Sequence, residues 1–299
     1  MNAHPLATGL GFAEGPVFTA NGEIAVASID QGVIRRLARD GTVLRTYDVG
    51  GGPNGLTEGP DGILYIAQCG AVGLSFREPD RGGQTGGVQA LYPDGRVEWV
   101  TRDPIWPNDL CFGPDGFLYV TDPTRRRPNR DGGGRIWRVD ITTGDAELLS
   151  SPAWYPNGIG FSHRDDELYV ASTGDSRIMK LTLDDRGIRD QDTFIQMTAG
   201  KPDGFAFDVE GNTVICALGQ EHGTRTPGEL QTWSARGELL NTFRPGPSHH
   251  YTNAAISSDG HLLFTDSAAG EALLVENWGV PGLALHPYRT TNSPQRSHV

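Results

Sequence analysis

The sequence predicts an all-β fold built from many short strands, and three observations support this. First, 41 glycines and 20 prolines among 299 residues, without collagen-like or low-complexity periodicity, indicate many tight turns. Second, helical periodicity is nearly absent. The one stretch with helix-forming residues, 181–196, is interrupted by Gly187 and rich in aspartate. Third, a segment of one form recurs six times along the chain.

Each copy of the repeat has a polar anchor residue, an apolar strand, a turn that in five copies contains glycine, and a second apolar strand. The anchors recur every 40 to 54 residues, which suits four-stranded blades, so we predict a six-bladed β-propeller with antiparallel blades. The six copies begin Glu14-Gly-Pro-Val-Phe, Asn54-Gly-Leu-Thr, Asn108-Asp-Leu-Cys-Phe, Asn157-Gly-Ile-Gly-Phe, Asp203-Gly-Phe-Ala-Phe and Thr252-Asn-Ala-Ala-Ile.

The last copy is short of outer strands before the polar end of the chain. We therefore expect Ala7–Phe12 to pair into the sixth blade and close the ring, because closure removes exposed strand edges. This predicts a single domain over residues 1–285, followed by a polar tail over 286–299. Separate β-sandwich domains are the alternative, but a repeat shared along the whole chain disfavours an internal boundary.

Composition restricts the partners. With 25 Lys and Arg against 37 Asp and Glu, the net charge is −12, which disfavours nucleic acid and anionic membrane surfaces. No run of 18 apolar residues predicts a membrane span, and residues 1–10 do not resemble a secretory leader. Cys69, Cys111 and Cys216 lack metal-type spacing and suggest reduced thiols. We expect a cytoplasmic protein that binds a small molecule; its oligomeric state is left open.

The six anchors predict a cation site. If each anchor begins the innermost strand of its blade, all six lie at one height around the central channel, and each offers an oxygen. Carboxylate and amide oxygens suit a hard divalent cation such as Ca²⁺, whereas the absence of Cys and His disfavours Zn²⁺ and copper. The alternative is that Pro-Asn-Gly and Pro-Asp-Gly are ordinary turns, which we accept for 60–62, 93–95 and 114–116 between strands.

Four of these motifs carry a family resemblance. Glu14-Gly-Pro, Pro107-Asn-Asp, Pro156-Asn-Gly and Pro202-Asp-Gly, in this order, resemble the senescence-marker-protein/gluconolactonase/luciferin-regenerating-enzyme family over residues 10–282. The resemblance implies a six-bladed propeller with a catalytic divalent cation. It implies Glu14, Asn157 and Asp203 as ligands and Asn108 as a ligand or a substrate-positioning residue. Ca²⁺ is favoured, with Mg²⁺, Mn²⁺ and Zn²⁺ as alternatives.

The stretches Asn54-Gly-Leu-Thr and Ala67-Gln-Cys-Gly are most similar to bacterial gluconolactonases, which often have histidine where Cys69 stands. Antiparallel pairing returns the end of each second strand to the level of the anchors, which places further residues at the mouth of the site. The predicted substrate-binding residues are Asn54, Asn108, Gln68, Cys69, Trp106, Trp154 and His250. The alternative for the two tryptophans is that they pack between blades, and the alternative for His250 is a structural role.

Two loops are also expected at the mouth. Residues 71–87 form a Gly-rich loop that we interpret as a lid or pocket wall. Arg125, Arg126, Arg127 and Arg130 form a basic cluster, either a clamp for an acidic substrate or a solvated loop.

The predicted activity is metal-dependent opening of a small lactone, in which the cation polarises the carbonyl and a carboxylate deprotonates water. Asp203 is the favoured base, and Asp122 is the second candidate. The alternative role of Asp122 is to cap a turn. Phosphotriester hydrolysis at the same site is an alternative, and a non-catalytic interaction scaffold is another. The sequence has no Gly-Xaa-Ser-Xaa-Gly motif, P-loop or Rossmann fingerprint, so serine-hydrolase, kinase and dehydrogenase functions have no support.

Overall fold

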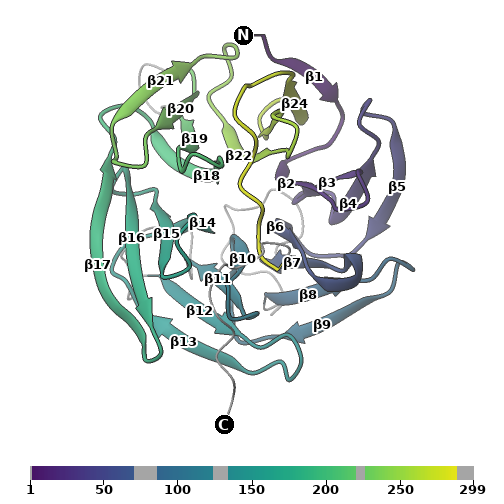
Figure 1. The fold of residues 1–299 in the computed structure, drawn as a ribbon. Helices are drawn as coiled ribbons and strands as arrows, with labels where there is room; N and C mark the ends of the chain where they lie inside the picture. The colour runs from purple at the N-terminus through teal and green to yellow at the C-terminus, as the bar shows by residue number, and fades with distance from the viewer. Residues whose placement is uncertain (1, 71–85, 124–133, 220–225, 288–299) are drawn as a thin grey trace.

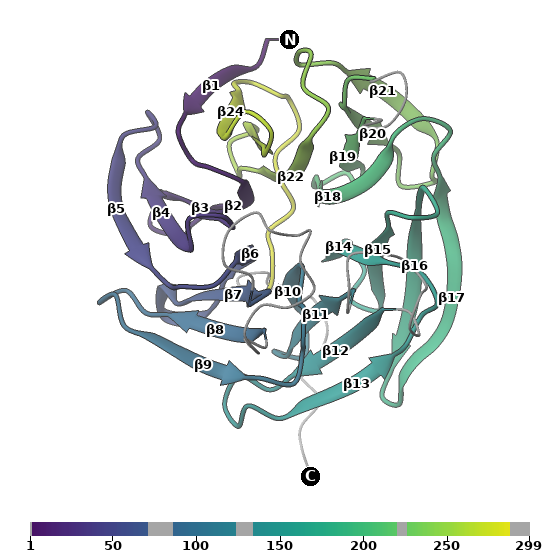
Figure 2. The same ribbon diagram turned by 180° about the vertical axis from the view of Figure 1, so that it is seen from behind.

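The computed structural model describes residues 2–70, 86–123, 134–219 and 226–287, which form six four-stranded antiparallel sheets arranged in a ring (Figures 1 and 2). This confirms the predicted six-bladed propeller. The strands are β1 (His4–Ala7), β2 (Ala13–Phe18), β3 (Ile24–Ser28), β4 (Val33–Leu37), β5 (Val43–Asp48), β6 (Pro53–Glu58), β7 (Leu64–Gln68), β8 (Gly87–Leu91), β9 (Val97–Thr101), β10 (Leu110–Phe112), β11 (Leu118–Asp122), β12 (Arg135–Val139), β13 (Ala146–Ser150), β14 (Pro156–Phe161), β15 (Glu167–Ser172), β16 (Arg177–Asp184), β17 (Gly187–Gln196), β18 (Lys201–Phe207), β19 (Thr213–Leu218), β20 (Glu229–Trp233), β21 (Leu239–Phe243), β22 (Tyr251–Ile256), β23 (Leu262–Asp266) and β24 (Glu271–Val275).

Five blades are formed by four strands that follow one another in the chain, from the innermost strand (β2, β6, β10, β14 and β18) to the outermost. The sixth blade contains β22, β23 and β24 and takes β1 as its outermost strand, with His4 opposite Leu274. The ring is therefore closed by an N-terminal strand, as predicted, and the edge of β24 is covered.

The residues of the closing strand differ from the prediction. The strand spans His4–Ala7, and the predicted range 7–12 contributes only its first residue. Gly9 and Gly11 have positive φ angles of 70° and 67°, so the chain turns there instead of continuing as a strand. The fully buried Leu10 anchors this turn in the core between the sixth and first blades.

The core consists of six apolar clusters, each between two neighbouring blades. Between the first two blades, for example, Ala25 and Ile34 pack with Leu64 and Ile66. Because the inner strands lie between two other blades, they are buried on both faces, and β3, β7 and β11 contain only buried residues. No helix in the described part of the chain is long and apolar enough to cross a bilayer.

The segment after β24 crosses the ring at the end opposite the anchors (Figure 1). Gly282 N donates to Ser257 O in the sixth blade, and Leu283 N donates to Phe207 O in the fifth, each at 2.9 Å. His286 is buried against the ring of Phe161 in the fourth. Residues 288–299 lie outside the described part, so the division at residue 285 stays a prediction.

Candidate functional site

The anchors lie where the innermost strands are irregular. Five of these strands have a register shift at the anchor, between residues 14 and 17, 53 and 56, 156 and 159, 202 and 205, and 251 and 254. In the third blade the regular strand starts only after the anchor, at Leu110. Such bulges redirect side chains and are common beside active sites. The irregularity recurs at the anchors, and the effect of the Asp203 and Asp109 charges on Glu14 shows that the first, third and fifth blades bring carboxyl groups near one another.

The glycine after an anchor is required by the neighbouring blade. A Cβ atom on Gly15 would lie 2.5 Å from Asn54 O, and one on Gly158 would lie 2.5 Å from Asp203 O. Real Cβ atoms do not approach backbone oxygens this closely. The anchor–glycine pairs of the inner strands are therefore packing elements of the ring, and not simply turn sequences.

Two blades have a larger residue at the glycine position. Asp109 occupies it in the third blade and Asn253 in the sixth, and Asn253 Nδ2 donates to Asp109 Oδ2 at 3.4 Å. These blades are opposite each other, so the hydrogen bond spans the channel. A Cβ on Gly55 would lie 2.1 Å from Asp109 Oδ1, and one on Gly204 would lie 2.1 Å from Asn253 Oδ1. The glycines leave the space that these two side chains fill.

Three carboxyl groups of this region are buried, and none of them has an ion pair with a Lys, Arg or His of the described ranges. Glu14, Asp109 and Asp203 are 6%, 8% and 8% exposed. Burial raises the pKa of Asp203 to about 8, and the charge of Asp109 adds to this, whereas a hydrogen bond from Asn157 opposes it. Burial also raises the pKa of Asp109 to about 6. The pKa of Glu14 is raised well above its usual value by burial, and then by the charges of Asp203 and Asp109.

Two asparagines complete the arrangement. Asn54 and Asn157 are buried, with 7% and 6% exposure. Asn157 Nδ2 donates to Thr173 Oγ1 at 3.0 Å, and Thr173 Oγ1 donates to Pro202 O at 2.7 Å. This chain of hydrogen bonds fixes the Asn157 amide beside the strand that bears Asp203.

Sequence reasoning named Asn108 and missed Asp109. Asn108 uses its backbone to join blades: its N–H donates to Thr121 O and its carbonyl accepts from Gly55 N, both at 2.8 Å. The carboxyl group that acts electrostatically on Glu14 and Asp203 belongs to the next residue, Asp109. The available signal was that Asp109 replaces the glycine present after four other anchors.

The contacts of Asp122 favour the turn-cap role over the acid–base role. Its carboxylate is completely buried and accepts hydrogen bonds from the backbone N–H groups of Ile105 and Trp106. It also accepts from Arg135 Nε at 3.2 Å and Trp137 Nε1 at 3.1 Å. A carboxylate with this many fixed donors is held in a structural network.

The Gln68 amide is likewise committed to structure. Its Oε1 accepts from Gly52 N and Gly70 N, and its Nε2 donates to Gly50 O and Gln89 Oε1. These bonds use both amide hydrogens and both acceptor positions. Gln68 therefore shapes the loops at the mouth.

The predicted aromatic residues have different surroundings. Trp154 is 8% exposed and belongs to the core between the third and fourth blades, which favours the packing alternative. Trp106 is partly exposed and packs on Ile29 and Cys69, and His250 contacts the ring of Phe12 edge to face. The Arg125–Arg127 cluster, Arg130 and residues 71–85 of the predicted lid lie outside the described residues.

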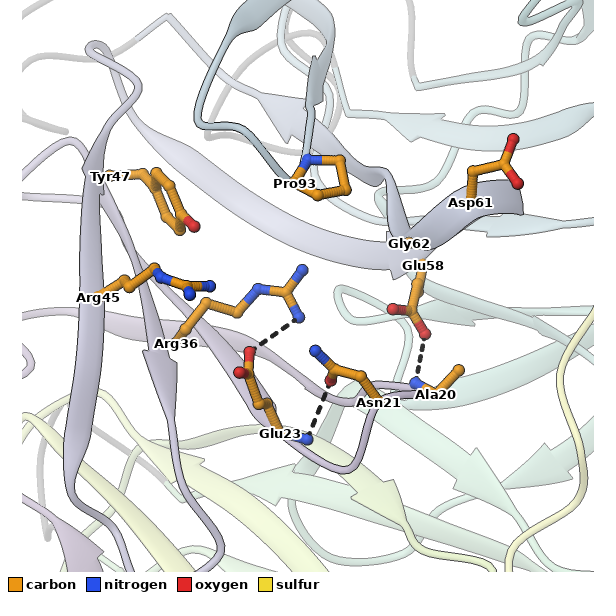
Figure 3. Close-up of a pocket in the computed structure, with 10 residues that line it drawn as sticks. All are labelled: Ala20, Asn21, Glu23, Arg36, Arg45, Tyr47, Glu58, Asp61, Gly62 and Pro93. Carbon is orange, nitrogen blue, oxygen red and sulfur yellow. Dashed lines mark hydrogen bonds and ion pairs between the residues drawn. The ribbon is translucent and has the colours of Figure 1, made fainter.

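A second polar region lies at the opposite end of the first two blades, in a cavity of about 430 Å³ (Figure 3). Arg36 Nη1 lies 3.6 Å from Glu23 Oε2, and Ala20 N donates to Glu58 Oε2 at 2.6 Å. Burial raises the pKa of Glu58, and the charge of Arg36 lowers it. Here the carboxylates have an arginine of the chain as a neighbour.

The comparisons with known proteins agree with the predicted family and fold. Residues 12–269 match the model of the SMP-30/Gluconolactonase/LRE-like region, and the chain belongs to this family. It is similar to a gluconolactonase of Zymomonas mobilis, with 25% identity over 88% of this chain and 78% of the relative.

Two solved structures share the fold. A gluconolactonase from Xanthomonas campestris superposes with a TM-score of 0.74 and 20% identity, over 94% of this chain and 89% of the other. A calcium-binding protein, regucalcin, from Agrobacterium tumefaciens superposes with a TM-score of 0.71 and 19% identity, over 93% and 92%.

The donors present here fit the divalent cation that the family implies. Burial raises the pKa of Glu14 and Asp203, and the charge of Asp109 raises both further, so a cation beside these carboxyl groups would be favoured; amide oxygens supply the neutral ligands that Ca²⁺ also accepts. Among the described residues no three His, Cys, Asp or Glu side chains form a metal cluster on their own. The ligand set would therefore combine Glu14 and Asp203 with the Asn157 amide.

Proposed function

We propose that this protein is a lactonase that hydrolyses a small cyclic ester at the anchor ring, with one divalent cation held by Glu14, Asn157 and Asp203. Ca²⁺ is the favoured cation, with Mg²⁺, Mn²⁺ or Zn²⁺ as alternatives. The observation that carries the proposal is the burial of Glu14, Asp109 and Asp203 without an ion pair to any described residue. Burying unpaired charge is costly, so an interaction scaffold would have no use for it.

Membership of a gluconolactonase family and likeness to the Zymomonas mobilis gluconolactonase support ester hydrolysis. The cation would supply Lewis-acid polarisation of the ester carbonyl. Asp203 would accept the proton of the attacking water, since it is a buried carboxyl group that would lie beside the bound cation. Asn54 and Asn108, on the two neighbouring blades, would orient the ester by hydrogen bonds. Asn108 would serve this positioning role or complete the ligand set.

The deciding experiment is a substrate panel. Protein loaded with each of the four cations is offered lactones and phosphotriesters, and hydrolysis is followed by proton release. We expect lactone turnover that stops after chelation and returns with metal. Turnover of phosphotriesters without lactones would replace the proposed activity with the phosphotriesterase alternative. No turnover together with no bound metal would favour a scaffold.

We also propose a cytoplasmic location. Cys69, Cys111 and Cys216 are unbridged, and Cys69 and Cys216 are buried. Free thiols suit a reducing compartment. Fractionation of the native host cells tests this.

A further inference from the structure

We use the name upper ring for the residues two positions before the six anchors, of which Gly52 has no side chain. In an extended strand, residues i and i−2 lie on the same face. The backbone ladder continues to this level in four blades, through hydrogen bonds from Ile29 N to Phe12 O, Cys69 N to Gly52 O, Thr173 N to Tyr155 O and Ser267 N to His250 O. The residues two positions before the anchors are Phe12, Gly52, Trp106, Tyr155, Lys201 and His250.

One side of this upper ring is apolar and continuous. Phe12 from the first blade and Trp106 from the third both pack on Ile29 and Cys69, which are 1% and 2% exposed. The Phe12 ring contacts His250 of the sixth blade edge to face, with centroids 5.4 Å apart. We call Phe12, Ile29, Cys69 and Trp106 the apolar wall. Phe12 and Trp106 are partly exposed.

The polar side chains beside the apolar wall bind the loops instead of the mouth. All four hydrogen-bonding positions of Gln68 are taken by Gly50, Gly52, Gly70 and Gln89. The carboxylate of Asp122 is held by the backbone of residues 105 and 106 and by two side chains. Hydroxyl groups of a sugar on this side would therefore lose water without gaining these partners.

The opposite side of the upper ring is polar. Its members there are the half-buried Tyr155 and the exposed Lys201, and in the fourth blade Asn157 Nδ2 donates to Thr173 Oγ1 at 3.0 Å. Two of the proposed ligands, Asn157 and Asp203, belong to these same blades. The site thus has a polar side next to its reactive groups and an apolar side across from them.

We infer that the lactone taken by this site carries an alkyl or aryl substituent that packs on the apolar wall, and that Trp106 and Phe12 select it over a polyhydroxylated lactone. This inference rests on the proposed lactonase function. Apolar burial favours such a substituent, and the aromatic faces add contact without ordering long side chains.

The test compares three δ-lactones with the same ring: unsubstituted, polyhydroxylated, and bearing a five-carbon alkyl chain. For the metal-loaded protein we expect kcat/KM for the alkyl lactone to exceed that for the polyhydroxylated lactone by about tenfold or more. Trp106→Ala should remove most of the preference for the alkyl over the unsubstituted lactone, mainly by raising KM. Trp106→Phe should keep this preference, and Phe12→Ala should weaken it even when Trp106 is intact.

Trp99→Ala is the matched control, because Trp99 is a partly exposed tryptophan on the outermost strand β9 and stacks on Arg102. It should leave the substrate preference unchanged. An equal or greater kcat/KM for the polyhydroxylated lactone, or a preference that survives Trp106→Ala, would overturn the inference while leaving the lactonase function intact. Absence of turnover even for the unsubstituted lactone would instead overturn the proposed function.

Discussion

The carboxyl groups in two regions of the propeller have different neighbours. At the anchor ring, burial raises the pKa of Glu14, Asp109 and Asp203, the charge of Asp109 raises those of Glu14 and Asp203 further, and none of the three has an ion pair with a described residue. In the cavity between the first two blades, Glu23 and Glu58 lie beside Arg36, whose charge lowers the pKa of Glu58.

The difference between the two regions shows how the fold accommodates a carboxylate that has no proposed role in function. The chain can place its own arginine beside a partly buried carboxylate, as Figure 3 shows for Glu23 and Arg36. At the anchor ring the described neighbours are asparagines and glycines, and no described arginine or lysine forms an ion pair with Glu14, Asp109 or Asp203. Uncompensated charge therefore separates the candidate site from the structural cavity, and each prediction tests this contrast.

The largest expected effect is the loss of the base. Asp203→Asn keeps an oxygen and nearly the same shape but cannot accept the proton. We expect kcat to fall by about 10²–10⁴-fold at saturating metal, the range that general-base catalysis contributes. Steady-state kinetics with metal occupancy measured by elemental analysis checks this.

Glu14→Gln is the matched control, because it also removes one buried negative charge from the ring but is assigned only a ligand role. Excess metal should restore much of its activity. If Asp203→Asn recovers as fully as Glu14→Gln, then Asp203 serves only as a ligand, and another group must accept the proton.

The second effect is the loss of stability on metal removal. A cation that binds only the folded state stabilises it by about 2.7 kcal/mol at a hundredfold excess over Kd. We expect a chelator to lower the melting temperature by several degrees and to abolish activity, and added Ca²⁺ or Mn²⁺ to restore both. The shift should shrink in Glu14→Gln. An active protein with an unshifted melting temperature after thorough chelation would contradict the cation site.

The third effect is the pH dependence of the metal-free protein. The folded pKa of Asp203 is about 8 and that of Asp109 about 6, whereas the unfolded values are about 3.9. Between about pH 4 and 8 the folded state retains protons that the unfolded state has lost, so the free energy of unfolding decreases as pH rises. Asp203→Asn should flatten the decrease above about pH 6. Urea titrations in chelator from pH 5 to 8 measure it, and a flat or rising wild-type curve would contradict it.

The fold was predictable because the same local constraint repeats in every blade. The glycine after Glu14, Asn54, Asn157 and Asp203 is forced by contact with the next blade, so the sequence itself carries the signal. The limits of the closing strand were less predictable. Gly9 and Gly11 could have continued a strand, and only their positive φ angles show that they turn the chain.

The candidate site was predictable to the level of the anchors. Asp109 was missed because its role depends on Asn253, which lies 144 positions away in sequence and across the channel. The saturated hydrogen bonding of Gln68 and Asp122 could not be predicted either, since it depends on loop backbones whose shapes the repeat does not specify. Long-range packing determines the roles of these residues, and the local sequence pattern does not.

The smallest effect concerns the compensated cavity. Arg36→Ala leaves Glu23 and Glu58 without their counter-charge, and we expect a loss of about 1–2 kcal/mol in the free energy of unfolding. Burial already raises the pKa of Glu58, so removing Arg36 should raise it further, and the loss should be larger above that pKa than below it. Adding Glu58→Gln should recover part of the loss, which a double-mutant cycle measures by urea unfolding at low and neutral pH.

Because the cavity lies at the end of the blades opposite the anchors, kcat and metal affinity should not change. If Arg36→Ala weakens metal binding as much as Glu14→Gln does, the two regions are coupled and the contrast between them is wrong.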